Sequence, residues 1–220
     1  MQVKTVAKSI AALAVSAAFA APAFADTVIL TDYTYPSAAT LSVGAPGYSG
    51  GAGQFTGLLN GNSFLTYCTE IGQNFSFNTL YTYSVVSGVT AWGAATSTAL
   101  DRVLSGAMAA GWPSNATQSA VVQAAVWEVL YETSGTYSFA GGTFIATGTG
   151  AVQTALDLAD PYWASLGSIP ITVHADQLFN PDRQNFLVMT AVPEPGTYAM
   201  MLAGLGLMGV IARRRNRVGA

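Results

Sequence analysis

The chain has 220 residues, a formal net charge of −3, one cysteine and one histidine. Residues 26–192 contain ten acidic residues, no lysine, and only Arg102 and Arg183 as basic residues. The formal charge of this stretch is therefore about −8. Such a surface repels phosphate backbones and has no basic patch, which argues against nucleic-acid binding, and a single cysteine excludes an internal disulfide framework.

The N-terminus has the pattern of a secretory signal peptide. Lys4 and Lys8 precede an apolar stretch at residues 10–19, which ends in the small-residue cleavage pattern Ala23-Phe24-Ala25. The apolar stretch is shorter than the roughly 20 residues that a membrane-spanning helix needs. We therefore predict that residues 1–25 are removed and that the exported chain begins at Asp26.

Residues 26–89 are rich in Thr, Tyr, Ser, Phe and Val with glycine-rich breaks, which predicts short strands and turns, residues 64–68 among them. Two alanine-rich helical patterns follow at residues 96–110 and 116–132. The Gly-Trp-Pro-Ser break at residues 111–114 separates them. These features predict a helical hairpin.

After a glycine- and threonine-rich connection, residues 150–166 have a helical pattern that Pro161 interrupts or redirects. Residues 169–179 and 185–192 are predicted to be closing strands. The expected fold class is α+β, with short antiparallel strands that flank an α-helical hairpin insert in a single domain at residues 26–192.

The C-terminal residues 193–220 have a different composition. Pro193, Glu194 and Pro195 are followed by an apolar segment at residues 197–212, which predicts a short, glycine-weakened transmembrane helix. A basic cluster comes next and is expected to stay cytoplasmic. Its members are Arg213, Arg214, Arg215 and Arg217.

This tail, VPEPGTYAMMLAGLGLMGVIARRR, resembles the PEP-CTERM sorting signal in motif, apolar helix and basic cluster. The resemblance implies an exosortase-type processing enzyme as a partner, acting near Pro193 to Pro195. It also implies an inner-membrane intermediate, held by the C-terminal helix, that then reaches the cell surface or the extracellular matrix. An ordinary tail anchor is the alternative.

Gln123 lies on the apolar side of the second predicted helix, in line with Trp127 and Tyr131, whereas Glu128 and Glu132 share the opposite face. Burying an amide without partners costs about 1 to 3 kcal/mol. Gln123 must therefore find hydrogen bonds or lose its amide by a chemical reaction. Gln118 stands three residues after a predicted N-cap, Asn115, which favours a capping role.

Four segments carry a second resemblance, to the thioester (TQXA) domains of bacterial surface adhesins. They are residues 67–70 (YCTE), 100–104 (LDRVL), 111–113 (GWP) and 123–127 (QAAVW). The resemblance implies a thioester between the Cys68 sulfur and the Gln123 side-chain carbonyl. Val122 stands where that family has threonine, and the earlier pair Thr117-Gln118 leaves Gln118 as an alternative partner.

A thiol held against an amide carbonyl can displace ammonia if the site excludes water and stabilises the oxyanion. Tyr67, Trp127 and Tyr131 are predicted to shield this site. The product would be open to a neutral amine on a partner, and the absence of lysine between residues 26 and 192 suits a protein that stores such a group. The sequence thus predicts covalent attachment to an amine-bearing surface ligand, without enzymatic turnover.

Simpler interpretations remain open. Cys68 can be an inert buried thiol or form an intermolecular disulfide, and the protein can be a non-reactive component of an extracellular polysaccharide or biofilm matrix. His174 is the one histidine that can serve Cys68 as the base of a hydrolase. The scattered acidic residues predict no metal site, and we expect no cofactor.

Overall fold

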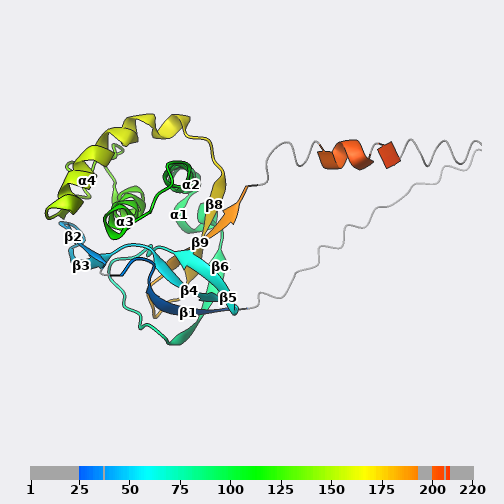
Figure 1. Cartoon of the computed structure of the whole chain (residues 1–220), viewed down its shortest axis with the longest axis horizontal. Helices are drawn as coiled ribbons and strands as arrows, with labels where there is room; N and C mark the ends of the chain where they lie inside the picture. Colours follow the sequence, from blue (N-terminus) through cyan, green and yellow to red (C-terminus); the bar gives the residue numbers. More distant parts are fainter. Residues whose placement is uncertain (1–24, 37, 193–199, 206, 209–220) are drawn as a thin grey trace, which may run out of the picture.

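The computed structural model describes residues 25–36, 38–192, 200–205 and 207–208. Its elements, most of them labelled in Figure 1, are β1 (Asp26–Tyr33), β2 (Ala39–Val43), β3 (Tyr48–Ala52), β4 (Phe55–Leu59), β5 (Asn62–Thr66), β6 (Leu80–Val86), α1 (Gly88–Trp92), α2 (Ala94–Ala109), α3 (Ala116–Tyr131), β7 (Ala146–Gly148), α4 (Ala151–Ala159), the 3-10 helix η1 (Asp160–Ser168), β8 (Val173–Phe179) and β9 (Phe186–Ala191).

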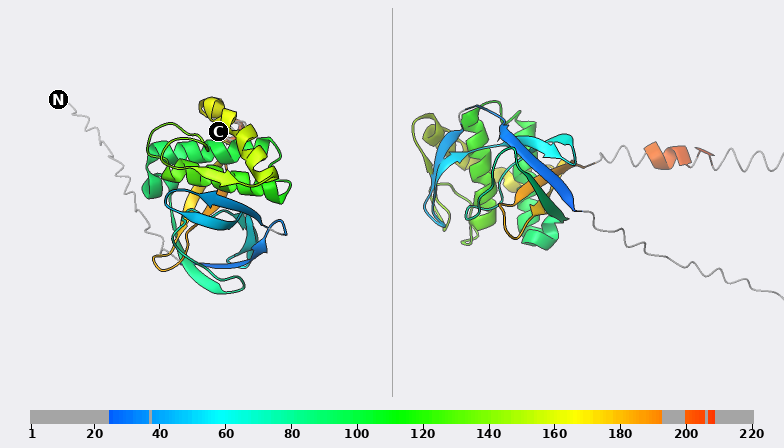
Figure 2. Two further views of the ribbon diagram at one scale, coloured as in Figure 1. Left: turned by 90° about the vertical axis from the view of Figure 1, so that its left-hand side faces the viewer. Right: turned by 90° about the horizontal axis from the view of Figure 1, so that it is seen from below.

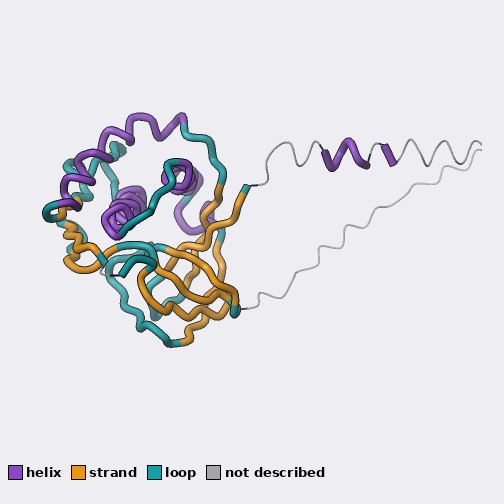
Figure 3. The backbone as a smooth tube through the Cα atoms, in the orientation of Figure 1, coloured by secondary structure: helices purple, strands orange, loops and turns teal. Residues whose placement is uncertain are grey.

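Strands and helices occupy two sides of the domain. Figure 3 shows most strands gathered on one side and α2, α3 and α4 on the other, and the left-hand view in Figure 2 shows the helices stacked over the strands. All strand pairs are antiparallel. The α+β class expected from the sequence is confirmed.

The larger sheet has six strands in the order β5-β4-β1-β6-β8-β9, and its two edges meet. Cys68, just after β5, forms an isolated antiparallel bridge with Phe186 of β9. On either side of that bridge, the Leu187 N–H donates to the Tyr67 carbonyl at 3.0 Å and the Thr69 N–H donates to the Asn185 carbonyl at 3.0 Å. The sheet therefore closes into a small barrel, and Cys68 lies in the seam.

A smaller sheet, in the order β3-β2-β7, lies beside the barrel and packs against the helices. Leu41 and Val43 of β2 are buried, and so is Ala146 of β7. These side chains join a cluster that includes Val152 and Leu156 of α4. The small sheet thus covers one side of the helical layer and extends the core beyond the barrel.

The helical hairpin follows from local signals. Gly111 adopts a positive φ of 70° after α2, and the Asn115 side chain caps α3 by accepting from the Gln118 N–H at 2.9 Å. The Gln118 side-chain oxygen accepts in turn from the Ser114 N–H at 2.7 Å, which completes a variant of the capping box. The predicted hairpin and the capping role of Gln118 are confirmed.

Helix α3 is the central element of the domain, with buried residues on all its faces. On one side it packs in a cluster with the barrel and the small sheet, and on the other in a cluster with α2, β8 and β9. The face of Glu128 is covered as well, because the chain after α3 folds back over it. Glu128 is 0% exposed, although its helical face was expected to be polar.

Several predicted boundaries shift. The strand expected at residues 64–68 is β5, which ends at Thr66, because Cys68 belongs to the seam and not to the β4–β5 ladder. The predicted helix at residues 150–166 is divided into α4 and η1 at Asp160, next to Pro161. Strand β8 begins at Val173, four residues later than expected.

Within the described part of the chain, no helix is long and apolar enough to cross a membrane. The predicted transmembrane segment at residues 197–212 is described only at helical residues 200–205 and 207–208. The signal peptide, the sorting motif (Pro193, Glu194 and Pro195) and the arginine cluster (Arg213, Arg214, Arg215 and Arg217) lie outside the described residues.

Candidate functional site

Cys68 is held in the barrel seam by the backbone hydrogen bonds on both sides of it. The residue is 4% exposed, and its thiol has no disulfide partner among the described residues. Because the seam is formed by the closure of β5 on β9, the position of Cys68 depends on both ends of the six-stranded sheet.

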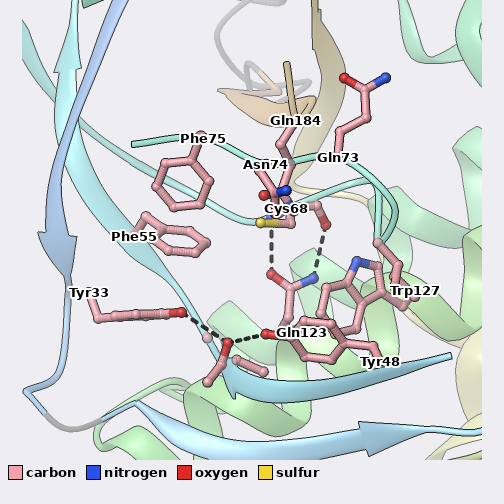
Figure 4. A pocket seen from close by; sticks show the side chains of 14 residues that line it. Tyr33, Tyr48, Phe55, Cys68, Gln73, Asn74, Phe75, Gln123, Trp127 and Gln184 are labelled. Atoms are coloured by element: carbon pink, nitrogen blue, oxygen red, sulfur yellow. Dashed lines mark hydrogen bonds between the residues drawn. The ribbon is translucent and has the colours of Figure 1, made fainter. Parts of the chain in front are cut away.

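Gln123 reaches Cys68 from the middle of α3. Its side-chain oxygen Oε1 accepts from the Cys68 N–H at 2.9 Å, and its Nε2 donates to the Cys68 carbonyl at 2.9 Å. Figure 4 shows the amide pointing at Cys68 with both interactions. Gln123 is 1% exposed, so this pair of hydrogen bonds satisfies a deeply buried amide.

A cavity of about 160 Å³ lies beside this pair. Most of the side chains that surround it are aromatic or polar and uncharged, and they come from distant parts of the sequence (Figure 4). The lining residues are Tyr33, Tyr48, Gly51, Ala52, Gly53, Phe55, Cys68, Ile71, Gln73, Asn74, Phe75, Gln123, Trp127 and Gln184.

Two tyrosines form one wall of this cavity. The Tyr33 and Tyr48 hydroxyls both donate to the Gly51 carbonyl, at 2.9 and 2.6 Å. The Tyr48 ring also meets Trp127 edge-on, with ring centroids 5.2 Å apart. The sequence does not predict these tyrosines as site residues, because nothing local to β1 or β3 shows that they lie near Cys68.

Of the three predicted shielding residues, only Trp127 lines this cavity. Tyr67 directly precedes Cys68 in an extended stretch, so its side chain points to the opposite side of the seam. There it packs in a cluster with residues of α2 and β8. The Tyr131 hydroxyl accepts from the Ile71 N–H at 3.1 Å and so holds the loop that borders the cavity. The aromatic cover at Cys68 consists instead of Tyr33, Tyr48, Phe55 and Phe75, together with Trp127.

The environment of the Cys68 sulfur disfavours its ionised form. Burial raises the pKa of the thiol well above its usual value, and the nearby Glu70 carboxyl raises it further. Since the thiolate is the form that oxidants and alkylating agents attack, the thiol is protected in the folded protein.

Gln118 and His174, the other candidate partners of Cys68, lie away from it. Gln118 is engaged in the N-cap of α3. His174 lies 2.6 Å from the Asp101 carboxylate and pairs with Thr190, four residues along β9 from Phe186, which bridges to Cys68. At about 3.3 Å per strand residue, this puts the histidine roughly 13 Å along the strand direction from the level of Cys68. The structure therefore brings Gln123, and neither Gln118 nor His174, to Cys68.

Comparison with known proteins identifies one feature of the chain. Residues 191–216 match the PEP-CTERM protein-sorting motif. Neither the comparison with curated proteins nor that with solved structures found a match. The resemblance of residues 64–132 to thioester domains stays a prediction.

The fold and the buried Cys68–Gln123 pair define an α+β domain with a protected amide–thiol site. The sorting motif marks the chain as an exported surface protein that passes through the membrane and is processed by an exosortase.

Proposed function

We propose that Cys68 and Gln123 form an internal thioester, through which the exported protein attaches covalently to an amine-bearing partner. The observation that carries the proposal is the pair of hydrogen bonds between the Gln123 side-chain amide and the Cys68 backbone. These bonds hold the amide against the backbone of Cys68, the residue whose sulfur would attack it.

The same contacts suit the formation of the bond. When Sγ of Cys68 attacks Cδ of Gln123, negative charge develops on Oε1, which already accepts from the Cys68 N–H. The Cδ–Nε2 bond breaks, the thiol proton passes to the leaving nitrogen, and ammonia departs. The Cys68 carbonyl accepts from Nε2 beforehand and so orients the leaving group.

The cavity provides the conditions under which the product persists. Aromatic rings and glycine backbone surround the pair, and both residues are almost fully shielded from water. A neutral amine that enters would attack Cδ, form an amide with Gln123 and leave its proton on the Cys68 sulfur. Each molecule would react once, so this is binding chemistry and not enzymatic turnover.

A non-reactive structural protein of an extracellular matrix is the second candidate. It is favoured by the complete hydrogen bonding of Gln123, because a satisfied amide can simply tie α3 to the barrel seam. In that case the raised pKa of Cys68 would serve only to keep the thiol inert.

The test is the mass of the peptides that contain Cys68 and Gln123, taken from protein secreted by cells, before and after treatment with methylamine. We expect a mass lower by one ammonia, no alkylation of Cys68 after denaturation, and methylamine added at Gln123. Gln118→Glu is the matched control, because it alters a neighbouring glutamine and should react like the unsubstituted protein.

Gln123→Glu and Cys68→Ala should both abolish the loss of ammonia and the uptake of methylamine. If the unsubstituted protein instead has its full calculated mass and Cys68 is alkylated readily once denatured, the thioester proposal fails. The second candidate function, a non-reactive matrix protein, then replaces it.

A further inference from the structure

The cavity beside Cys68 and Gln123 has one wall that consists of two tyrosines joined through a single backbone carbonyl. The Tyr33 and Tyr48 hydroxyls donate to the Gly51 carbonyl from opposite sides, at 2.9 and 2.6 Å (Figure 4). Both tyrosines are partly exposed, whereas the reacting pair is almost fully buried. An amine that attacks Cδ of Gln123 must therefore be accommodated in this cavity, against this tyrosine wall.

The rings of the tyrosine wall are held in place by other aromatic side chains. Tyr33 packs on Phe55 with ring centroids 4.6 Å apart and meets Phe77 edge-on at 5.8 Å. Tyr48 meets Trp127 edge-on at 5.2 Å. Neither ring can turn aside without the loss of a hydrogen bond and of an aromatic contact. The cavity therefore does not widen readily at this wall.

Two glycines of β3 make room for the two hydroxyls. A Cβ at Gly50 would lie 2.8 Å from the Tyr48 hydroxyl oxygen, and one at Gly51 would lie 3.2 Å from the Tyr33 hydroxyl oxygen. Either contact is closer than a Cβ normally tolerates, so a larger residue would displace a hydroxyl. The glycine pair thus allows both tyrosines to converge on one carbonyl.

Volume and charge limit the amine further. The cavity has a volume of about 160 Å³, close to that of the engineered cavity of about 150 Å³ that holds benzene. None of the residues that line it is charged. A charged substituent would therefore lose its hydration without gaining an ionic partner. The substituent that fits is uncharged and has about the size of one six-membered ring.

We propose that Tyr33 and Tyr48 determine which amine the protein accepts: a primary amine whose substituent is uncharged and no larger than one six-membered ring. Larger substituents, such as fused rings, are excluded by the fixed wall. The two tyrosines act by shape and take no part in the making or breaking of bonds. This inference rests on the proposed thioester, to which it adds the class of amine and the residues that select it.

The test compares amines that differ in one feature. Benzylamine and 1-naphthylmethylamine share the aminomethyl group and differ by one fused ring, whereas β-alaninamide and β-alanine are similar in size and differ in charge. Each amine is added to the secreted protein at the same concentration of its unprotonated form. The mass of the peptide that contains Gln123 gives the rate of addition, with methylamine as the reference.

In the unsubstituted protein, we expect 1-naphthylmethylamine to add about tenfold more slowly than benzylamine, or slower still, because small misfits in a pocket already have such effects. The charge of β-alanine should slow it relative to its amide by about tenfold or more. Tyr48→Ala and Tyr33→Leu should each bring the two ring amines within about threefold of one another, because the wall is opened.

Tyr48→Phe keeps the ring against Trp127 and should retain the discrimination. Tyr162→Ala, at a tyrosine that is 68% exposed, is the control away from the cavity and should also retain it. Each comparison is a ratio of two rates within one variant. A variant that is only partly folded lowers both rates and leaves their ratio as it was.

Equal rates for benzylamine and 1-naphthylmethylamine in the unsubstituted protein overturn the proposal, and so does unchanged discrimination in both Tyr48→Ala and Tyr33→Leu. Equal rates for β-alanine and its amide overturn the exclusion of charge. The thioester survives these outcomes, because methylamine still adds to Gln123. If the unsubstituted protein takes up no methylamine, the proposed function itself fails, and the selection of amines fails with it.

Discussion

Gln123 shows how one side chain can tie two parts of a fold together. Its amide spans from α3 to the barrel seam, and both of its polar atoms bind the backbone of Cys68. Its position on an apolar helical stripe indicated an amide that needs a partner. The structure supplies that partner from a residue 55 positions away in sequence.

Glu128 is a buried acidic residue of α3. Its Oε1 accepts from the Ser138 N–H at 2.7 Å, and its Oε2 has no partner among the described residues. Burial raises the pKa of this carboxyl from 4.5 to about 8, against the lowering effect of the Ser138 hydrogen bond, and the carboxylates of Glu132 and Asp160 raise it further. Glu128 is therefore protonated at neutral pH.

This shift predicts a pH-dependent stability. Because the folded-state pKa is raised, the contribution of Glu128 is fully present below pH 4.5 and is lost as the pH rises through about 8. We expect the free energy of unfolding to fall by about 3 to 4 kcal/mol between about pH 5 and pH 8 through this group. Glu128→Gln, neutral at every pH, should lack that part of the slope.

Urea unfolding at the two pH values measures the difference. Asp157→Asn is the control: its carboxylate accepts only from the Gln153 side chain on the surface, and the change should leave the slope as it is. Parallel slopes for Glu128→Gln and the unsubstituted protein would show that Glu128 is ionised when folded.

At the scale of elements, the barrel depends on close approach between β1 and β4. Gly57 of β4 pairs with Leu30, next to a register shift between Leu30 and Asp32 in β1. A Cβ at Gly57 would collide with the Ile29 carbonyl oxygen and meet the Leu30 Cα at 3.0 Å. A side chain at this point would push the two strands apart, since backbone atoms cannot move aside as a side chain can.

Gly57→Ala should therefore lower the free energy of unfolding by about 2 kcal/mol or more, as overpacking does in well-packed cores. Gly44→Ala is the matched control, since a Cβ there meets nothing within 4 Å, and its stability should change by less than about 0.5 kcal/mol. Chemical denaturation of both variants gives the comparison. Equal stabilities would mean that β1 and β4 have room to separate.

At the scale of the whole molecule, the sorting motif and the folded domain are distinct parts of one chain. Strand β1 begins and strand β9 ends on the same side of the domain (Figures 1 and 2). The matched sorting motif starts at residue 191, the last residue of β9. The matched motif therefore begins where the last strand of the barrel ends.

Replacing Pro193, Glu194 and Pro195 together by alanine should block this processing, because the enzyme is expected to recognise these residues. We expect the variant to keep its C-terminal arginines and to accumulate in the membrane fraction, as intact mass and cell fractionation would show. Asp182→Ala, an exposed change before β9, should be processed normally. A triple variant that is secreted at the same processed mass would place the recognised residues elsewhere.

The sequence by itself determined the features whose signals are local. The hairpin, the Asn115 cap and the sorting motif were all predictable, because capping residues, glycine breaks and a contiguous motif act over a few positions. It also singled out Cys68 and Gln123 as a pair, through a resemblance that no comparison confirms.

Only the tertiary structure decided what surrounds that pair. Helical periodicity gives the direction of a side chain but not the residues that it meets, so Tyr33 and Tyr48 were missed and Tyr67 was assigned to the wrong side of the seam. The barrel closes through a contact between Cys68 and Phe186, which are distant in sequence. Glu128 is buried because the chain that follows α3 folds back over it. Such contacts form only when the whole core packs, which is why no local pattern encodes them.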